Sequence, residues 1–193
     1  MPHAQFRHLL AGLDTVQVAY YLRCIGYGAE FSFEKLLLER ERLRAANTRT
    51  GCVVEIGDRT FQLQRYGSSS GYPLVLKNAE VTIECGENNS PGFFVTYRSE
   101  ALWRRGAQAL HEAFIAWAES VGLVVVRDES LSRVDYAFDY SLPAVDFTED
   151  SVVSLSLGTK DAQYRDFNFK SSARKTHFFG PGVNTTRVGG LPG

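Results

Sequence analysis

Five short apolar segments between Gly51 and Tyr97 follow one another with brief connections. They alternate apolar and polar residues or are rich in β-branched and aromatic side chains, as strands are. Their connections consist of turn-forming residues and are too short for the crossover that two parallel strands require. The sequence therefore predicts an antiparallel meander with strands at Cys52–Ile56, Thr60–Tyr66, Leu74–Leu76, Glu80–Cys85 and Phe93–Tyr97.

Two helices are predicted, one before and one after this meander. The clearer one runs from Glu100 to Val121 after Ser99 as N-cap, with apolar residues at three- and four-residue spacing. A stripe of this kind covers one face of a sheet. A shorter helix is predicted over residues 33–46 with Ser32 as N-cap, and its mixed charges are typical of a solvated surface.

Three further strands complete the predicted fold, at Thr15–Leu22, Leu123–Val126 and Ser132–Tyr140. The expected class is α+β, a mostly antiparallel sheet with the long helix packed on one face and a shorter N-terminal helix. An apolar fraction of 44% argues against a disordered chain. We expect one domain over residues 1–157. Residues 158–193 are rich in Gly, Pro, Ser and Thr and predict a largely unstructured tail or an incomplete element.

The strand at Ser132–Tyr140 has two different faces, because successive side chains of a strand point to opposite sides. One face is apolar and contains Val134, Tyr136 and Phe138. The other face carries Arg133, Asp135 and Asp139. Two carboxylates beside an arginine suit a divalent cation or a polar substrate, whereas a strand with a solvated charged face shows the same pattern. We expect the long helix to cover the apolar face.

Charge is distributed unevenly along the chain, whose net charge is -1. Residues 1–157 carry 15 Lys and Arg against 20 Asp and Glu, and residues 158–193 carry 6 against 2. Clustered cations release counterions when they meet phosphates, so the basic tail hints at a polyanionic partner. The candidate DNA contacts in this tail are Lys160, Arg165, Lys170, Arg174 and Lys175.

Several common enzyme motifs are absent from the sequence. It contains no GxxxxGK[ST] loop, no GxGxxG, no GxSxG elbow and no HExxH, and its four histidines form no HxH pair. Its three cysteines have neither zinc spacing nor the density of a secreted disulfide scaffold. No apolar run approaches the roughly 18 residues of a membrane span. We therefore expect a soluble, cytoplasmic protein with no membrane partner.

Residues 98–103 (RSEALW) open the long predicted helix, and residues 131–139 (LSRVDYAFD) contain the pattern SRxDxxxD. With residues 160–165 (KDAQYR), these segments resemble the replication initiation factor family, the rolling-circle initiators of plasmids and filamentous phages. The resemblance covers roughly residues 93–166. It implies a sequence-specific, metal-dependent enzyme that nicks and joins DNA. A tyrosine attacks an origin phosphate and keeps the 5′ end, while the free 3′ hydroxyl primes replication.

Carried over by position, the resemblance assigns Asp135 and Asp139 to a Mg2+ or Mn2+ site. It assigns Arg133 to a phosphate contact or to a residue that supports the metal ligand. Members continue into an Arg-x-Tyr-Asp-Lys type motif, whereas this chain reads NTTRVGG at residues 184–190, which leaves Tyr164 as the candidate nucleophile. We therefore expect the N-terminal portion of an initiator, inactive if its C-terminal catalytic part is missing.

Two alternatives to a nicking enzyme stay open from the sequence. The first is a non-catalytic origin-binding or regulatory module that holds DNA through its sheet and basic tail. The second is an interaction domain without nucleic acid, for which the acidic residues 1–157 are the argument. A homodimer is compatible with each of these functions.

Overall fold

The computed structural model describes residues 7–26, 28–46, 51–141, 165–168, 175–179 and 186–189. They fall into two compact units. Residues 11–137 form the larger unit, and residues 1–10 with 138–193 form the other. The predicted domain boundary between residues 157 and 158 lies outside the described residues.

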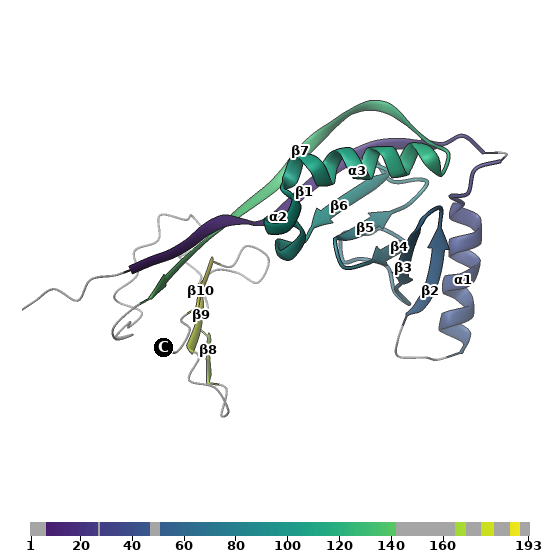
Figure 1. The fold of residues 1–193 in the computed structure, drawn as a ribbon. Helices are drawn as coiled ribbons and strands as arrows, with labels where there is room; N and C mark the ends of the chain where they lie inside the picture. Colours follow the sequence, from purple (N-terminus) through teal and green to yellow (C-terminus); the bar gives the residue numbers. More distant parts are fainter. Residues whose placement is uncertain are drawn as a thin grey trace, which may run out of the picture. The chain divides into compact units, whose positions relative to one another are not determined.

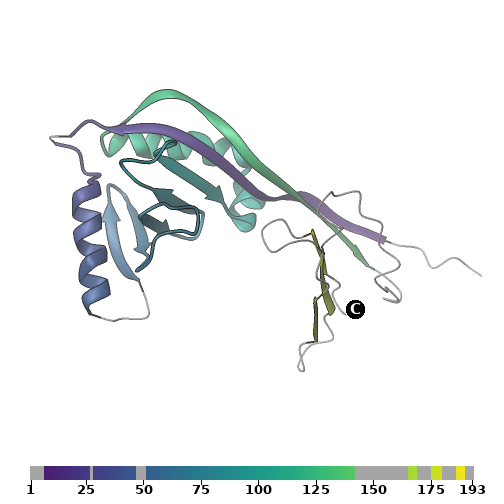
Figure 2. The ribbon, with the colours of Figure 1, turned by 180° about the vertical axis from the view of Figure 1, so that it is seen from behind.

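A seven-stranded sheet forms the larger unit, in the order β2-β3-β4-β5-β6-β1-β7 (Figure 1). Strands β2 to β6 form the predicted meander, in which each strand pairs antiparallel with the next. Strand β1 then pairs antiparallel with β6, with Val18 opposite Val95. Strands β1 and β7 lie side by side and run in opposite directions (Figures 1 and 2). The strands are β1 (Arg7–Cys24), β2 (Cys52–Ile56), β3 (Arg59–Leu63), β4 (Leu74–Lys77), β5 (Val81–Cys85), β6 (Phe93–Tyr97) and β7 (Leu123–Ser141).

The helices agree with the sequence in position and differ in one detail. Helix α1 (Phe33–Ala45) begins after Ser32, whose Oγ accepts a hydrogen bond from the Lys35 amide at 3.3 Å, as predicted. The predicted long helix is two helices, α2 (Ser99–Arg105) and α3 (Ala107–Ser120). They are separated by Gly106, whose φ of +80° does not continue an α-helix. Ser99 is the first residue of α2 and not its N-cap.

The hydrophobic core lies between one face of this sheet and the helices. In α3, Phe114 packs on Tyr20 of β1 with ring centroids 4.5 Å apart, and Trp117 packs on Phe61 of β3 at 5.3 Å. Trp117 Nε1 also donates a buried hydrogen bond to the Ile56 carbonyl at 3.0 Å. Phe33 of α1 contacts Phe93 of β6 on the same face. The α+β class predicted from the sequence is therefore confirmed.

Strand β7 corrects two expectations. The predicted strands at 123–126 and 132–140 are one continuous strand. The long helix does not cover the Val134, Tyr136 and Phe138 face, because Tyr136 is 66% exposed and Phe138 60% exposed. The apolar side of α3 is already used on Tyr20 and Phe61, and α2 packs its Trp103 over Gly12 of β1.

The second unit contains a three-stranded antiparallel sheet in the order β10-β9-β8. Its strands are β8 (Arg165–Asn168), β9 (Lys175–Phe179) and β10 (Thr186–Gly189). The expectation of a largely unstructured tail is thus wrong for these residues, which include the strand-favouring Thr176, Phe178, Phe179 and Val188. Among the described helices, none has the length and apolar character that a membrane crossing requires.

Candidate functional site

Arg133 and Asp135 form a two-pronged ion pair on β7. Arg133 Nε donates to Asp135 Oδ1 at 2.8 Å, and its Nη2 lies 2.6 Å from Oδ2. This hydrogen bonding raises the pKa of Arg133, to which the nearby charges of Asp135 and Asp14 also contribute, while burial opposes it. Both carboxylate oxygens of Asp135 are therefore engaged by one guanidinium group.

The ion pair lies on the side of the sheet that carries α2. Trp103 of α2 covers Gly12, and Asp14, two residues further along β1, points to the same face. Glu129 of β7 contacts His111 of α3, and Arg133 and Asp135 share its side of the strand by alternation, which places the ion pair on that side as well. We expected the helices on the opposite face, so this expectation is wrong. Arg133 is nevertheless exposed and Asp135 half-buried.

The expected metal ligands are not joined by further ligands in the part of the chain that the structure describes. Asp139 is exposed and belongs to the unit that contains residues 138–193. Within the described ranges, no group of three or more His, Cys, Asp or Glu side chains is placed to hold a metal ion. With both oxygens of Asp135 held by Arg133, the described residues do not fit a metal site as they stand.

The other sequence-predicted residues are only partly placed. Arg165 lies in β8 opposite Phe178, and Lys175 lies in β9 opposite Asn168. The remaining predicted residues lie outside the described residues: Tyr164, Lys160, Lys170 and Arg174.

A chain of polar contacts links β7 to the centre of the core. Glu129 Oε1 lies 3.4 Å from His111 Nε2, His111 Nδ1 lies 2.8 Å from the Tyr20 hydroxyl, and this hydroxyl lies 2.6 Å from that of Tyr97. Burial raises the pKa of Tyr20 to about 12, although the hydrogen bond with Tyr97 opposes the shift. A buried phenol that keeps its proton is a poor nucleophile. Tyr20 therefore has a structural role.

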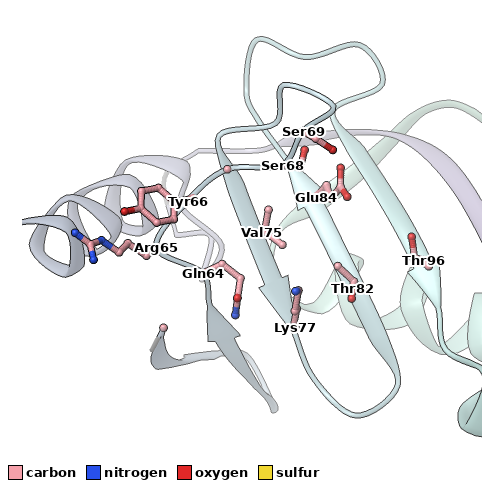
Figure 3. A pocket seen from close by; sticks show the side chains of 12 residues that line it. Gln64, Arg65, Tyr66, Ser68, Ser69, Val75, Lys77, Thr82, Glu84 and Thr96 are labelled. Carbon is pink, nitrogen blue, oxygen red and sulfur yellow. The ribbon is translucent and has the colours of Figure 1, made fainter. Parts of the chain in front are cut away.

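The face of the sheet opposite the helices contains a depression of about 710 Å³. Figure 3 shows Lys77, Thr82 and Thr96 projecting into it from β4, β5 and β6. Arg65 and Tyr66, which follow β3, form its border (Figure 3). Cations, hydroxyls and an aromatic ring thus meet in one concave surface.

Arg65 and Tyr66 of this border form a cluster with Arg44 of α1, which we call the Arg44–Arg65–Tyr66 cluster. Arg44 Nε donates to the Arg65 carbonyl at 3.3 Å, and Arg65 Nη2 donates to the Arg44 carbonyl at 3.4 Å. The guanidinium carbons lie 5.9 and 5.1 Å from the centre of the Tyr66 ring, which is 62% exposed. Glu41 offsets part of this charge, because its carboxylate lies 3.1 Å from Arg44 Nη1.

The sequence analysis missed this cluster. Arg44 was assigned to the solvated face of a helix, and Arg65 and Tyr66 were assigned to the end of a strand. The available signal was an Arg-Tyr pair directly before the flexible loop Gly67–Gly71. Arg44 lies 21 residues earlier, and only the fold brings it to the same place.

Glu84 of β5 provides a hydrogen-bond acceptor at the depression that has no donor among the described residues. Its Oε2 is buried and has no hydrogen-bond partner among the described residues. The pKa of the neighbouring Tyr72 is raised, mainly by burial and also by the charge of Glu84. A ligand with an amino or hydroxyl donor would satisfy this oxygen.

Comparisons of the chain with models of protein families, with curated proteins and with solved structures give no match. A function is therefore argued from the geometry of these residues together with the segments that carry the resemblance described above.

Proposed function

We propose that this chain binds DNA as a replication initiation protein of the rolling-circle type, acting at a plasmid or phage origin. Single-stranded DNA lies on the open face of its seven-stranded sheet. The observation that carries the proposal is the Arg44–Arg65–Tyr66 cluster beside the depression, where two guanidinium carbons lie 5.9 and 5.1 Å from the centre of an exposed aromatic ring. Proteins that hold single strands combine such stacking rings with cations along the backbone.

Each part of the depression has a role in this proposal. Arg65 and Lys77 contact phosphates, and a base stacks on Tyr66. Only a base that is unpaired can stack on the ring in this way. Glu84 accepts from the amino group of a base, a contact that carries sequence information. The cations would thus position the DNA strand, and Glu84 in the depression would recognise the base.

Metal-dependent nicking is the second candidate, and the segment at residues 131–139 favours it through its resemblance to initiators. In that function Asp135 and Asp139 hold Mg2+ or Mn2+, and a tyrosine, with Tyr164 as the candidate, attacks the DNA. The ion pair with Arg133 and the missing third ligand among the described side chains both oppose it. DNA binding without cleavage is therefore the function that the geometry supports best.

Binding is tested by fluorescence anisotropy with a labelled single strand of about 20 nucleotides and a duplex of equal length. We expect tighter binding of the single strand and a loss of affinity in Tyr66→Ala. Leu38→Ala is the matched control, because Leu38 is similarly exposed, at 58%, and does not line the depression. Equal affinities of Tyr66→Ala and the unaltered chain would contradict the proposed surface.

Nicking is tested with a supercoiled plasmid that carries the coding sequence and its flanking DNA, in the presence of Mn2+. Cleavage that Asp135→Asn abolishes and Asp128→Asn retains would support the enzyme, since Asp128 is an exposed aspartate of the same strand. Binding without cleavage supports the non-catalytic module. Neither binding nor cleavage at low salt would contradict both candidates.

A further inference from the structure

Strand β7 is the last strand of the seven-stranded sheet. It pairs with β1 on one side, and the described residues place no strand on its other side. Its outward N–H and C=O groups form a row that another strand can pair with. Several large apolar side chains of this strand are also exposed, among them Val126 by 55% and Leu131 by 64%. A long edge of this kind can serve as a docking surface for a partner strand.

The charges of β7 are complementary about Leu131, because the residues two positions before and after Leu131 carry opposite charges. Ser130 and Ser132 flank this residue. Glu129 on one side corresponds to Arg133 on the other. The acidic residue thus has a basic counterpart at the same distance from the centre.

We propose that β7 pairs antiparallel with β7 of a second copy of this chain, about a twofold axis at Leu131. Each Leu131 then lies opposite its own copy. Glu129 lies opposite Arg133 of the second copy. Because a twofold axis repeats every contact, two opposite-charge pairs form, and opposite charges across an antiparallel pair stabilise it. The two sheets become one continuous sheet.

The same charges exclude the neighbouring registers. In an antiparallel pair, the residue numbers of opposite residues have a constant sum. In the neighbouring registers that keep each side chain on the same face of the sheet, this sum changes by two. A change in one direction places Glu129 opposite Leu131 and removes both ion pairs, and a change in the other places Glu129 opposite Asp135. Like charges directly opposite each other are destabilising. Charges on an edge strand commonly prevent pairing, whereas these permit one register with an identical strand.

The contacts that these residues make within one chain are compatible with this pairing. Arg133 holds Asp135 of its own strand, and Glu129 lies 3.4 Å from His111. Arg127 lies over the ring of Tyr21 at 3.6 Å, on the face of the sheet opposite Tyr20 and His111, and takes no part in the pairing. In the dimer Glu129 and Arg133 each gain a second partner from the other copy, which extends the ion pairs into a network across the axis.

Cross-linking of the full-length chain tests the axis directly. Residues opposite each other in an antiparallel pair have Cα atoms roughly 4.5–5.5 Å apart, within the range that a disulfide spans. Leu131→Cys should therefore form a covalent dimer under mild oxidation, seen on a non-reducing gel. Leu38→Cys is the matched control, because Leu38 is 58% exposed and lies on α1. Equal dimer formation by the two variants would overturn the proposal.

Analytical ultracentrifugation tests the register. Leu131→Lys should raise the dimer dissociation constant at least tenfold, because two lysines meet on the axis, whereas Leu38→Lys should not change it. Glu129→Arg should weaken the dimer, and adding Arg133→Glu should restore it. Circular dichroism confirms that each variant is folded. A monomeric unaltered chain at about 100 μM, or a charge exchange without recovery, would overturn the proposal. DNA is absent from both experiments, so their result is independent of the proposed function.

Discussion

Arg133 holds both carboxylate oxygens of Asp135, with its Nε 2.8 Å from Oδ1 and its Nη2 2.6 Å from Oδ2. The two residues are two apart in one strand, so their side chains leave the same face of the sheet and meet without a change in the backbone. The arginine of the SRxD segment therefore has a local structural role, which is to hold the carboxylate two residues later. A metal ion at Asp135 has to compete with a guanidinium group for the same oxygens.

Asp135→Asn should change stability little. The pair is open to solvent, and exposed ion pairs contribute roughly 0.2–1 kcal/mol. We expect the free energy of unfolding in urea to fall by less than about 1 kcal/mol, a change similar to that of Asp128→Asn on the same strand. If this holds, a loss of activity in Asp135→Asn reports on chemistry. A loss of several kcal/mol would show that the pair supports the fold.

Two substitutions in the open face should separate stacking from charge. Tyr66→Ala should weaken single-strand binding by about 1–3 kcal/mol and leave its salt dependence unchanged, because stacking releases no counterions. Lys77→Ala should lower the slope of log affinity against log salt by about 0.7, because one phosphate contact to a single strand is lost. Affinity is measured between about 50 and 200 mM salt. An unchanged slope in Lys77→Ala would remove this lysine from the site.

The strands of the meander could be predicted because their alternation and turns are local signals. Phe93–Tyr97 has the same bounds in prediction and structure, and Gly57 in the turn between β2 and β3 has a left-handed φ of +62°, as tight hairpin turns commonly require. The break at Gly106 was missed because a single left-handed residue leaves the apolar spacing of both helices intact. Sequence periodicity therefore found the helices and not the joint between them.

The two proposed surfaces were harder to predict for different reasons. Residues 127–131 of β7 carry three charges in a row and show no apolar alternation, and all five are exposed. The Arg44–Arg65–Tyr66 cluster joins a helix to the end of a strand 21 residues away. Only tertiary structure brings Arg44 to Arg65 and Tyr66, so the local Arg-Tyr pair alone does not predict the cluster.

Gly122→Ala should be much more destabilising than Gly71→Ala. Both glycines have a left-handed φ, +85° and +88°, which costs a residue with a side chain roughly 1–2 kcal/mol. A Cβ at Gly71 meets nothing within 4 Å, whereas one at Gly122 lies 2.6 Å from Ala29 Cβ. We expect the overlap to add roughly 1–3 kcal/mol, measured by urea unfolding. Equal losses in the two variants would show that this contact relaxes freely.

Cys85 should be inert to alkylation in the folded protein. Its side chain is fully buried, and burial raises the pKa of its thiol, so the reactive thiolate is both scarce and inaccessible. Cys24 and Cys52 are half-buried and should react first with iodoacetamide at pH 8. Peptide mass spectrometry measures the three rates, and urea should bring that of Cys85 up to the others. Early labelling of Cys85 without denaturant would contradict the packing of β5.

Stability should fall steeply between pH 10 and 12 because of Tyr20. Burial raises its pKa from 10.0 to about 12, and the pKa of Tyr97 is raised as well, so the folded chain keeps protons that the unfolded chain releases. This stabilisation is fully present below pH 10 and is lost as the pH rises toward the folded value. Urea unfolding at pH 9, 10 and 11 measures the slope. Tyr20→Phe removes the ionisable hydroxyl and should flatten it, whereas Tyr66→Phe, at an exposed tyrosine, should leave it unchanged. A Tyr20→Phe variant with the same alkaline slope as the unaltered chain would show that the buried hydroxyl is not the group that titrates.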